Sequence, residues 1–497
     1  MVIDSPPSVE WLLKKFLDKD YEIYIVGGAV RDLLLGKQVS DWDFATNVFP
    51  EIIVQLFEDT FYENAFGTVG VVYPEEKKRY EENIIPVLPI YEVTTFRTEH
   101  GYSDNRRPDN VEWGTTLEDD LKRRDFTINA MALKPVRENN RLNYELIDQH
   151  GGKYDLDNKV IRTVGNPADR FEEDSLRMMR AIRIGAQLGF SLEENTLNAI
   201  IKYKDLINKI SMERIRDELL KIVSSYYPSQ GITLLYTCGL LEYILPELIE
   251  GRDVWQGGHH KDDVWTHSLK SLDACPSNNK IVKLATLIHD IGKPRSRALI
   301  CQKCKYFYKP KEDIDTVNEV EEWICERCGN LNMYKETVAF HNHEMIGEKM
   351  AEEICDRLRL SNIDREKIVK LVRWHMFSVD ERQTEKAIRR FIKNVGKENL
   401  EDILDLRIGD RIGGGARETS WRLERFKKLI ELVQQQPFEI RDLKIKGTDI
   451  MKLLQIPPGR RIGEILRTLF EEVEDKLIEN NLDVLQKRVL ELGKDIN

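Results

Sequence analysis

The stretch YIVGGAVRDLLLGKQVSDWDFATN, residues 24–47, decides how the N-terminal part of the chain folds. Its first three residues are aromatic or β-branched and predict a strand. Gly27-Gly28 interrupts this run, and residues 29–35 have a helical pattern. A Gly-Gly turn that leads into a helix offers backbone N–H groups to an anion, and Arg31 adds a charged donor. The stretch therefore predicts a strand, a turn and a helix that can bind phosphate.

A second strand is expected over residues 41–45, and it carries Asp41 and Asp43. Residues i and i+2 of a strand point to one face, so the two carboxylates lie side by side. Such a pair is costly unless a cation or solvent screens it, and Mg²⁺ is usually held by carboxylates together with substrate phosphates. A surface turn with a solvated strand end is the alternative. The order and spacing of the two halves favour a site for a nucleoside triphosphate and Mg²⁺.

The composition of the chain is that of a globular protein with several domains. It has 497 residues, of which 41% are hydrophobic and 32% charged, and this length predicts about three or more domains. The net charge of −11 restricts nucleic-acid contacts to local basic surfaces. We find no transmembrane-length apolar run and no signal-peptide pattern, so we expect a cytoplasmic protein without a membrane contact. No protein partner is identifiable.

Residues 67–73 and 90–96 read as two more strands of the N-terminal part. Glu92, in the second run, is either a third carboxylate of the site or an ordinary exposed strand residue. The charged segment 75–82 is expected to be a solvated hairpin tip. Residues 97–113 carry Gly, Pro and Asp-Asn turn signals and are expected to form a mobile loop.

Two further segments carry charged side chains at informative spacings. Arg123 and Arg124 beside Asp125 form either a surface ion pair or ligands for a triphosphate. Residues 172–190 are expected to form one helix with an apolar stripe and a second row of charged residues. This row is either an exposed salt-bridged face or a set of acceptors and donors that reads the edge of a base. Its members recur every three residues: Asp174, Arg177, Arg180 and Arg183.

The second half of the chain contains histidines and an aspartate on segments that read as separate helices. They are His267, the adjacent pair His289-Asp290, His343 and His375. Such side chains suit a divalent metal and the hydrolysis of phosphoesters, and a structural role in a helical body is the alternative. Further candidates are His259, His260 and Asp380.

Cys301, Cys304, Cys325 and Cys328 form two Cys-x-x-Cys pairs, with twenty residues between the pairs. Four thiolates at this spacing predict a tetrahedral Zn²⁺ site, and disulfides are disfavoured in a reducing compartment. Aromatic and basic side chains lie nearby and either contact RNA or pack the small knuckle. They are Lys303, Lys305, Tyr306, Phe307, Tyr308, Lys309 and Lys311.

Taken in order, these motifs resemble those of the class II tRNA nucleotidyltransferases, the family of CCA-adding enzymes and bacterial poly(A) polymerases. The resemblance is carried by VGGAVRDLLLG, SDWDFAT, EVTTFR, RRPDNVEW, RRDFTINAMAL, EEDSLRMMRAIRIGAQLGF and ERIRDELLKI. The later segments DRIGGG and IKGTDIMKLLQIPPGRRIGEIL are similar to the body and tail of the family, so nearly the whole chain is covered. Some members also carry an HD-like domain.

The resemblance implies roles for individual residues. Asp41 and Asp43 would bind the catalytic Mg²⁺ ions of a two-metal nucleotidyl transfer. Asp174 and Arg177, in the motif that begins at Glu173, would act as an amino-acid template for C and A. The other residues would hold the nucleotide: Gly27, Gly28 and Arg31 its triphosphate, and Arg124, Asp125, Arg180 and Arg183 the rest.

The fold class expected from the resemblance is α+β. A polymerase β-like nucleotidyltransferase head would be followed by an all-α neck, body and tail, with an inserted zinc-ribbon-like knuckle built on the four paired cysteines. The expected divisions are a head at 1–155, a base-recognition neck at 156–250, an HD-like domain at 251–380 with the insert at 298–335, and a tRNA-binding body and tail at 381–497. Within the last part, Gly413–Gly415 is expected to be a flexible turn.

The expected reaction is the addition of C, C and A to tRNA 3′ ends from CTP and ATP. The loop at 97–113 looks complete, which disfavours a CC-adding enzyme, whereas an A-adding enzyme would keep it. A poly(A) polymerase is a further alternative within the family. An HD phosphohydrolase with an RNA-binding head is a second alternative, and an RNA-binding protein without enzymatic activity is a third. The implied cofactors are Mg²⁺, a structural Zn²⁺, and a further divalent metal in the HD-like domain.

Overall fold

The computed structural model describes residues 3, 5–63, 67–100, 110–113, 116–138, 141–257, 262–308, 322–333, 337–377, 384–434, 440–474 and 477–494. Several sequence-derived candidates lie outside the described residues: His259, His260, Lys309, Lys311, Asp380 and the central part of the expected loop, residues 101–109. Among the helices that are described, none has the length and apolar character needed to cross a membrane.

The head is built on a seven-stranded mixed sheet with the order β3-β4-β5-β2-β1-β8-β9. The strands are β1 (Ile23–Val26), β2 (Asp43–Thr46), β3 (Thr60–Glu63), β4 (Thr68–Val71), β5 (Tyr91–Thr95), β8 (Ala132–Glu138) and β9 (Arg141–Ile147). All neighbours pair antiparallel except β2 and β5, which are parallel. The helices of this part are α1 (Pro7–Leu17), α2 (Gly28–Leu34), α3 (Pro50–Leu56), α4 (Pro74–Glu81), α5 (Leu117–Lys122) and α6 (Gly152–Asp157).

The remainder of the chain is helical apart from one inserted β unit and a short parallel pair, β10 (Val160–Ile161) with β11 (Ser191–Leu192). The neck contains α7 (Pro167–Glu173), α8 (Leu176–Leu188), α9 (Glu194–Tyr203), α10 (Met212–Val223) and α11 (Pro228–Thr237). The body contains α12 (Leu241–Ile244), α13 (Pro246–Ile249), α14 (Val264–Ala274), α15 (Lys280–Ile288), α16 (Lys293–Ser296), α18 (His343–Arg357), α19 (Asn362–Trp374), α20 (Glu385–Val395), α21 (Leu400–Gly413) and α22 (Trp421–Gln434). The tail contains α23 (Gly447–Leu454), α24 (Arg460–Glu474) and α25 (Leu482–Lys494).

The inserted β unit lies between α16 and α18 and carries the four paired cysteines. It comprises β12 (Arg297–Ile300), β13 (Phe307–Tyr308), β14 (Glu322–Ile324), β15 (Leu331–Met333) and β16 (Val338–Phe340). Strands β13, β12 and β16 form one sheet, and β14 pairs with β15. The predicted α+β class, with a mixed-sheet head, a helical remainder and an inserted cysteine knuckle, is confirmed.

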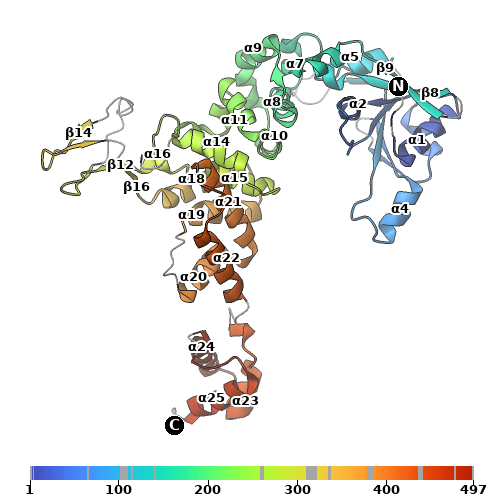
Figure 1. Cartoon of the computed structure of the whole chain (residues 1–497). Coiled ribbons are helices and arrows are strands. Elements are labelled where there is room, and N and C mark those ends of the chain that lie inside the picture. The colour runs from blue at the N-terminus through green and yellow to red at the C-terminus, as the bar shows by residue number, and fades with distance from the viewer. Residues whose placement is uncertain are drawn as a thin grey trace.

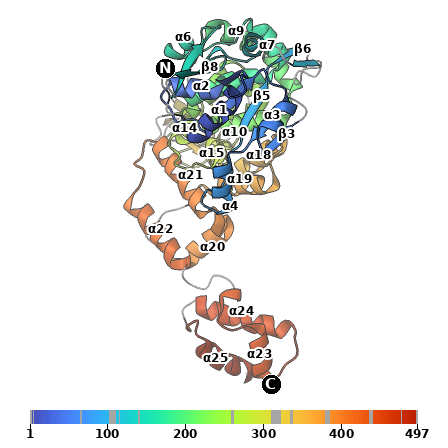
Figure 2. The same cartoon turned by 90° about the vertical axis from the view of Figure 1, so that its right-hand side faces the viewer.

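The molecule has the shape of a hook. Figure 1 shows the head and the tail at opposite ends, with the neck arching between the head and the body, and the β insert projecting from the body on the side away from the head. The view turned by 90° shows the head in front of the body, with the tail extending beyond both (Figure 2). One continuous hydrophobic core runs from Val9 in the head to Val433 in α22, while the tail has a separate core between Leu443 and Val489.

Local predictions for the head need three corrections. The second strand begins at Asp43 rather than at residue 41, so Asp41 lies just before it. Residues 75–82 do not form a hairpin tip, because Pro74 starts helix α4, whose first turn is acidic and whose last turn is basic, as the helix dipole favours. The ends of the expected loop 97–113 pair as strands β6 (Arg97–His100) and β7 (Asn110–Trp113).

The expected single helix over residues 172–190 is also wrong, because the chain breaks at Asp174. This residue has an extended backbone (φ −141°, ψ 103°) between α7 and α8. Its side chain accepts a hydrogen bond from the backbone N–H of Leu176 at 3.1 Å, which satisfies a donor at the start of α8. The break therefore places a carboxylate at a helix junction instead of along a helix face.

Gly409 and Gly413 allow α21 to approach α14 closely. The expected flexible turn at Gly413–Gly415 is wrong at its first residue, because Gly413 is the last residue of α21. A Cβ at Gly409 would lie 2.6 Å from the backbone oxygen of Ser271, and one at Gly413 would lie 2.8 Å from the backbone nitrogen of Ser271. Neither contact can be relieved by rotating a side chain. The two helices are therefore held together by glycines spaced one turn apart.

We expect Gly409→Ala to lower the free energy of unfolding by about 1–3 kcal/mol, because the added methyl group forces the two backbones apart. Gly463→Ala is a matched control, since Gly463 lies inside α24 with no atom within 4 Å of its Cβ position. Removing a helical glycine there should leave stability unchanged or raise it by up to about 1 kcal/mol. Urea denaturation followed by circular dichroism measures both, and equal effects of the two changes would contradict the close-packing account.

Candidate active site

The candidate site of the head lies at the ends of three adjacent strands. Asp43, the first residue of β2, pairs with Val26 of β1 on one side and with Glu92 of β5 on the other. Paired residues on adjacent strands project to the same face, so Glu92 shares its face with Asp43. Asp41 is exposed and directly precedes the strand. The structure therefore brings the carboxylates of Asp43 and Glu92 into register and places Asp41 two residues before Asp43.

Gly27 brings the backbone of the turn against this carboxylate edge. It has a φ of 71°, a value that favours glycine, and a Cβ here would lie 3.1 Å from Asp43 Oδ2 and 3.2 Å from Arg124 Nη1. Gly28 begins α2, and Arg31 on this helix donates to Asp32 and to Asn129 Oδ1, the latter at 3.0 Å. The turn, the carboxylate and a guanidinium thus meet at one point.

The environment of Asp43 favours a bound cation. Burial, followed by the charge of Asp41, raises the pKa of Asp43 from 3.8 to about 6, while Arg124 lowers it and Glu92 raises it further. An ionised carboxylate in this position is costly in the absence of a positive partner. A divalent ion ligated by carboxylate oxygens supplies such a partner, so the donor set at this edge fits Mg²⁺.

Arg124 is fixed by a residue that the sequence motifs did not mark. Asp120 is fully buried on α5 and accepts hydrogen bonds from Arg124 Nη2 at 3.2 Å and from Arg123 Nη2 at 2.6 Å. Burial alone would raise the pKa of Asp120, but the charges of Arg124 and Arg123 outweigh it and hold the pKa below its ordinary value. The i, i+3 and i, i+4 spacing to two arginines is a signal that could have identified Asp120.

Asp125 connects the head to the neck. Its carboxylate is 7% exposed, accepts the N–H of Phe126 at 2.9 Å, and pairs with Arg180 Nη2 of α8 at 2.6 Å. Burial would raise the pKa of Asp125, but Arg180 and then Arg177 outweigh it and keep the pKa low. The sequence suggested that Arg123 and Arg124 pair with Asp125. In the structure both arginines pair with Asp120 instead.

The predicted base-reading residues lie at the junction of α7 and α8. Asp174 is buried, and Arg214 Nη2 of α10 donates to its Oδ2 at 2.8 Å. Arg177 is also buried and donates to Glu173 and to the backbone oxygen of Arg170. Of the two residues predicted to recognise the base, Asp174 is therefore held by Arg214 and Arg177 by Glu173.

Arg183 lies one helical turn beyond Arg180 on α8. Its Nε is 2.9 Å from Glu218 Oε2 of α10, a carboxylate that is itself buried. Arg214 and Glu218 lie in the segment ERIRDELLKI, but no role was predicted for them, because each lies on a helix remote in sequence from its partner. The structure thus gathers every predicted nucleotide residue at the head–neck junction.

The four cysteines converge in the β insert. Their sulfur atoms lie within 4.8 Å of one another, and the closest pairs, Cys301–Cys328 and Cys304–Cys325, are both 3.6 Å apart. Each Cys-x-x-Cys pair forms the same turn, closed by bonds from Lys305 N to Cys301 O and from Gly329 N to Cys325 O. Ligand sulfurs 2.3 Å from a tetrahedral ion lie roughly 3.8 Å apart, so this geometry fits one Zn²⁺.

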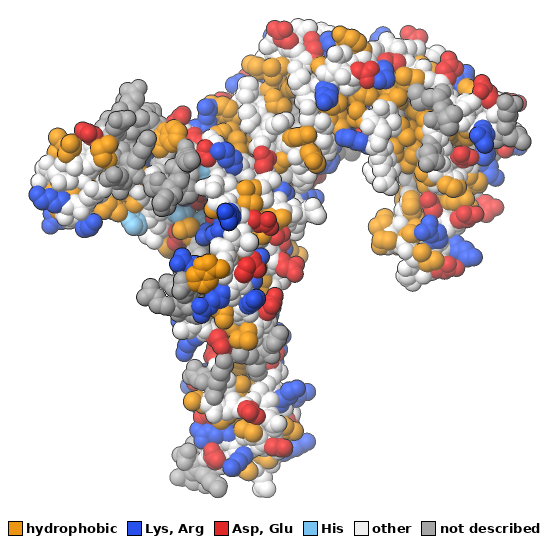
Figure 3. All heavy atoms as spheres, in the orientation of Figure 1, with side chains coloured by type: hydrophobic (Ala, Val, Ile, Leu, Met, Phe, Trp, Pro, Cys, Tyr) orange, Lys and Arg blue, Asp and Glu red, His pale blue; other side chains and the backbone are white. Residues whose placement is uncertain are grey.

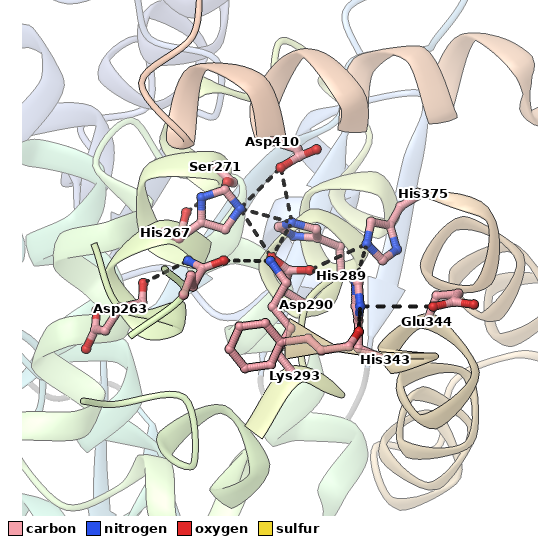
Figure 4. A network of polar contacts seen from close by, with 12 residues as sticks. Asp263, His267, Ser271, His289, Asp290, Lys293, His343, Glu344, His375 and Asp410 are labelled. Atoms are coloured by element: carbon pink, nitrogen blue, oxygen red, sulfur yellow. Dashed lines mark hydrogen bonds and ion pairs between the residues drawn. The ribbon is translucent and has the colours of Figure 1, made fainter. Parts of the chain in front are cut away.

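The predicted HD-type residues also converge, in the body and away from the head. His267 lies on α14, His289 and Asp290 follow α15, His343 begins α18, and His375 follows α19. All five side chains are buried, and Asp290 lies between two pairs of histidines (Figure 4). Asp410 of α21 is the first residue of the DRIGGG segment but was not predicted as a ligand; its Oδ1 lies 3.2 Å from His267 Nε2.

Asp43→Asn should stabilise the metal-free protein in a pH-dependent way. Because the pKa of Asp43 in the folded protein, about 6, exceeds its ordinary value of 3.8, the cost of ionisation is absent below about pH 4 and complete above about pH 6. The shift of roughly two units corresponds to about 3 kcal/mol at most, and solvent screening reduces this to about 1–2 kcal/mol. Thermal melts in EDTA at a series of pH values measure the difference.

The two melting curves should converge at the acidic end and separate as the pH rises. Adding Mg²⁺ should raise the melting temperature of the unsubstituted protein more than that of the variant. A stability difference that stays constant from about pH 4 to about pH 8 would rule out the ionisation of Asp43 as its cause.

Three sequence families match separate parts of the chain. Residues 23–162 match the poly(A) polymerase head domain, and residues 189–251 match the family described as "Probable RNA and SrmB-binding site of polymerase A". Residues 337–489, which begin just before the last strand of the inserted β unit, match domain 2 of the tRNA nucleotidyltransferases. The matches cover the head, the later part of the neck and most of the body and tail, whereas residues 163–188, with α7 and α8, lie between two matches.

Curated relatives include the CCA-adding enzymes of Ligilactobacillus salivarius, 43% identical over 235 residues, and Lactobacillus helveticus, 46% identical over 232 residues. The CCA-adding enzyme of Bacillus pumilus is 44% identical over 242 residues. These matches cover 46–48% of this chain and 53–55% of the relatives, so the chain matches about half the length of each.

Solved structures show the fold over nearly the whole chain. The Bacillus stearothermophilus CCA-adding enzyme in complex with CTP superposes with a TM-score of 0.65 at 24% identity and covers 99% of both chains. The Thermotoga maritima CCA-adding enzyme complexed with tRNA covers 98% of this chain with a TM-score of 0.55 at 18% identity. With its matched head domain, RNA-binding-site region and tRNA nucleotidyltransferase domain 2 in this order, the chain is similar to the CCA-adding enzymes and shares their fold.

Proposed function

We propose that the protein adds C, C and A to the 3′ end of tRNA from CTP and ATP without a nucleic-acid template. One observation carries this proposal: the carboxylate edge at Asp43 is linked through Arg124 and Asp125 to the buried pair Asp174 and Arg177. A nucleotide that spans these residues would have its triphosphate at the strand ends and its base at the neck. The naming of the relatives as CCA-adding enzymes supports the same activity.

The head would bind the triphosphate and carry out the transfer. Gly27 and Gly28 let the backbone approach the phosphates, and Arg31 and Arg124 add guanidinium donors. Asp41 and Asp43 would hold Mg²⁺, which when bound supplies activation of the RNA 3′-hydroxyl and neutralises charge on the departing pyrophosphate. Glu92, in register with Asp43, is positioned to act as a further acceptor at the same edge.

The neck would select the base. Cytosine and adenine both present an exocyclic amino donor next to a ring-nitrogen acceptor, and Asp174 and Arg177 offer an acceptor and donors in complement. Because Arg214 holds the carboxylate of Asp174 and Glu173 holds the guanidinium of Arg177, both groups are oriented before a nucleotide binds. Arg180 and Arg183 would support this wall from the same helix.

The tRNA would lie along the hollow side of the hook. The space-filling view shows the surface hollowed between the head and the body, with Lys and Arg side chains interspersed among acidic ones along the body and tail (Figure 3). Because the net charge of the chain is negative, contacts with RNA must come from local basic side chains such as these. They suit recognition of the backbone and shape of an RNA. We assign residues 1–155 to the head, 156–250 to the neck, 251–380 to the HD-like domain and 381–497 to the tRNA-binding body and tail of a cytoplasmic enzyme.

An A-adding enzyme, a CC-adding enzyme and a poly(A) polymerase are the nearest alternatives within the family. The paired strands β6 and β7 retain the segment between EVTTFR and RRDFTINAMAL, which speaks against a CC-adding enzyme that is shortened there. Only the nucleotides that are incorporated distinguish the remaining members.

Incubation with tRNA transcripts that end before, within or after the CC of the CCA end, and with CTP or ATP alone, tests the proposal. We expect C to be added to the first two ends and A only to the third. Asp41→Asn with Asp43→Asn should lower incorporation by at least about 10³-fold, because both metal-binding carboxylates are lost. Asp217→Asn, which changes an exposed carboxylate of α10, is the control.

No incorporation of C into any transcript would reject the CCA-adding activity. Unchanged incorporation by the double variant would reject the assignment of the metal-binding carboxylates.

For the insert, we propose that the four cysteines hold one structural Zn²⁺. Cys301→Ser should lower the zinc content by about one equivalent per chain, because three thiolates bind the ion more weakly than four. Cys355→Ser, at a buried cysteine of α18 outside the insert, is a matched control that should leave the zinc content unchanged. Elemental analysis of the purified variants measures this, and an unaltered zinc content in Cys301→Ser would contradict the proposal.

A further inference from the structure

A cavity of about 320 Å³ is lined by the last two turns of α21 and by the start of α22. Its volume lies at the lower end of the range of small-ligand sites, roughly 300–1,000 Å³. Three of the lining side chains carry guanidinium groups and none is acidic, so the cavity favours an anion over a cation. The lining residues are Arg407, Arg411, Ser420, Trp421, Arg422 and Leu423.

The two arginines of α21 are held in place by neighbouring groups of the protein. Arg407 Nη1 donates to Asp410 Oδ2 at 2.7 Å, and the guanidinium carbon of Arg407 lies 5.6 Å from the centroid of the Phe377 ring. Arg411 Nε donates to the backbone oxygen of Arg417 at 3.1 Å. Because these contacts orient both side chains before a ligand arrives, binding costs little further side-chain entropy.

Both arginines of α21 keep donors that a ligand can use. Arg407 Nε is buried and has no hydrogen-bond partner within the described part of the chain. Among the described residues, Arg411 makes its one hydrogen bond from Nε, which leaves its two terminal nitrogens available. Buried donors in proteins are normally paired, and a ligand with several acceptor oxygens would pair these. A phosphate group is such a ligand.

The start of α22 adds to the positive character of the cavity. Ser420 precedes this helix, and its Oγ accepts the N–H of Leu423 at 3.3 Å. The N–H groups of Trp421 and Arg422 belong to the first turn, which has no acceptors within the helix, and the helix dipole favours an anion there. The nearest acidic residue on this helix, Glu424, does not line the cavity.

Trp421 offers a flat apolar surface beside these donors. It is 59% exposed, and the guanidinium carbon of Arg422 lies 5.4 Å from the centroid of its ring. Bases of unpaired nucleotides stack on exposed aromatic side chains, and this stacking depends little on which base it is. The guanidinium groups and the indole therefore match the two parts of a nucleotide, its phosphate and its base.

We propose that this cavity is a nucleotide-binding site of the body, in which the arginines bind a phosphate group and Trp421 stacks against the base. A free nucleotide and an unpaired nucleotide of an RNA strand both carry these two groups. Inorganic phosphate lacks the base, and a double-stranded RNA does not expose it. The site is separate from the transfer site in the head, binds its ligand without a metal ion, and does not depend on the activity proposed for the head.

Isothermal titration calorimetry of the full-length protein in EDTA tests the site, with UMP and inorganic phosphate as probes. EDTA and uracil exclude the proposed transfer site, which is expected to need Mg²⁺ and to select C and A. We expect Arg411→Ala to weaken binding of both probes at least about 10-fold, because charge-assisted hydrogen bonds are lost. Trp421→Ala should weaken binding of UMP about 10-fold and leave that of phosphate unchanged. Arg425→Ala, at an exposed arginine of α22 outside the cavity, is the matched control.

A fluorescently labelled single-stranded oligouridylate distinguishes the two sources of the nucleotide. Binding at least about 10-fold tighter than that of UMP would assign the site to an RNA strand, whereas equal binding would assign it to a free nucleotide. In both cases Arg411→Ala should weaken the binding and Arg425→Ala should not. Fluorescence anisotropy measures the affinity, and circular dichroism shows that each variant is folded.

Photo-cross-linking locates the bound base in the unsubstituted protein. Because trypsin cleaves after Arg417 and Arg422, 4-thio-UMP should label the tryptic peptide 418–422, which contains Trp421. Labelling only of other peptides would overturn the proposal. So would equal affinities of Arg411→Ala and Arg425→Ala, or a folded protein that binds neither UMP nor the oligouridylate. Unchanged binding of UMP by Trp421→Ala would overturn the contact with the base.

Discussion

The ion pair between the buried carboxylate of Asp125 and the partly exposed guanidinium of Arg180 is the constraint on which the arrangement of the proposed transfer site depends. It joins the strand ends of the head to helix α8 of the neck, and both partners lie beside residues proposed to bind the nucleotide. A buried carboxylate is stabilised by a paired charge, and loss of Arg180 would leave the carboxylate of Asp125 buried without this partner. Because Arg180 and Arg177 keep the pKa of Asp125 low, the pair stays charged at neutral pH.

A second buried carboxylate, Asp120, fixes the two arginines that directly precede Asp125 in the sequence. It lies fully buried and holds Arg123 and Arg124, so Arg124 is directed toward Gly27 and Asp43. The distance between the proposed metal-binding edge and the proposed base-reading junction is thus fixed by two buried acids and their arginines. The chemistry proposed for the head requires this rigidity, since small misplacements of reacting groups lower rates strongly.

The sequence was sufficient for much of the fold and for part of the site. The order of strand, turn, helix and strand around Gly27 followed from local residue types, and so did the cysteine knuckle, because their signals lie within a few residues of one another. The motifs that resemble a family predicted that helical segments follow the mixed-sheet head, as the structure has them. Boundaries were less accurate: the break at Asp174 replaced a continuous periodic helix, because a side-chain bond to the backbone outweighed the periodicity.

Contacts between remote segments were beyond the reach of the sequence. Arg214 reaches Asp174 from a helix forty residues away, and Asp410 reaches His267 from a helix near the end of the body. Arg214 lies in the segment ERIRDELLKI and Asp410 in the segment DRIGGG, but neither segment indicates which residue it contacts. The close crossing of α14 and α21, made possible by Gly409 and Gly413, brings Asp410 to the cluster, and a glycine spacing in one helix does not reveal which helix it meets.

The cysteine knuckle enters and leaves the body through two paired strands, and this has a consequence for how the chain can vary. Arg297 of β12 lies opposite Phe340 of β16, so the two ends of the insert are about 5 Å apart, a gap that a tight turn would also close. The unit has its own small core around Leu299. It can therefore be lengthened, shortened or exchanged without moving α16 or α18, which makes this point of the body a natural place for related chains to gain or lose a module.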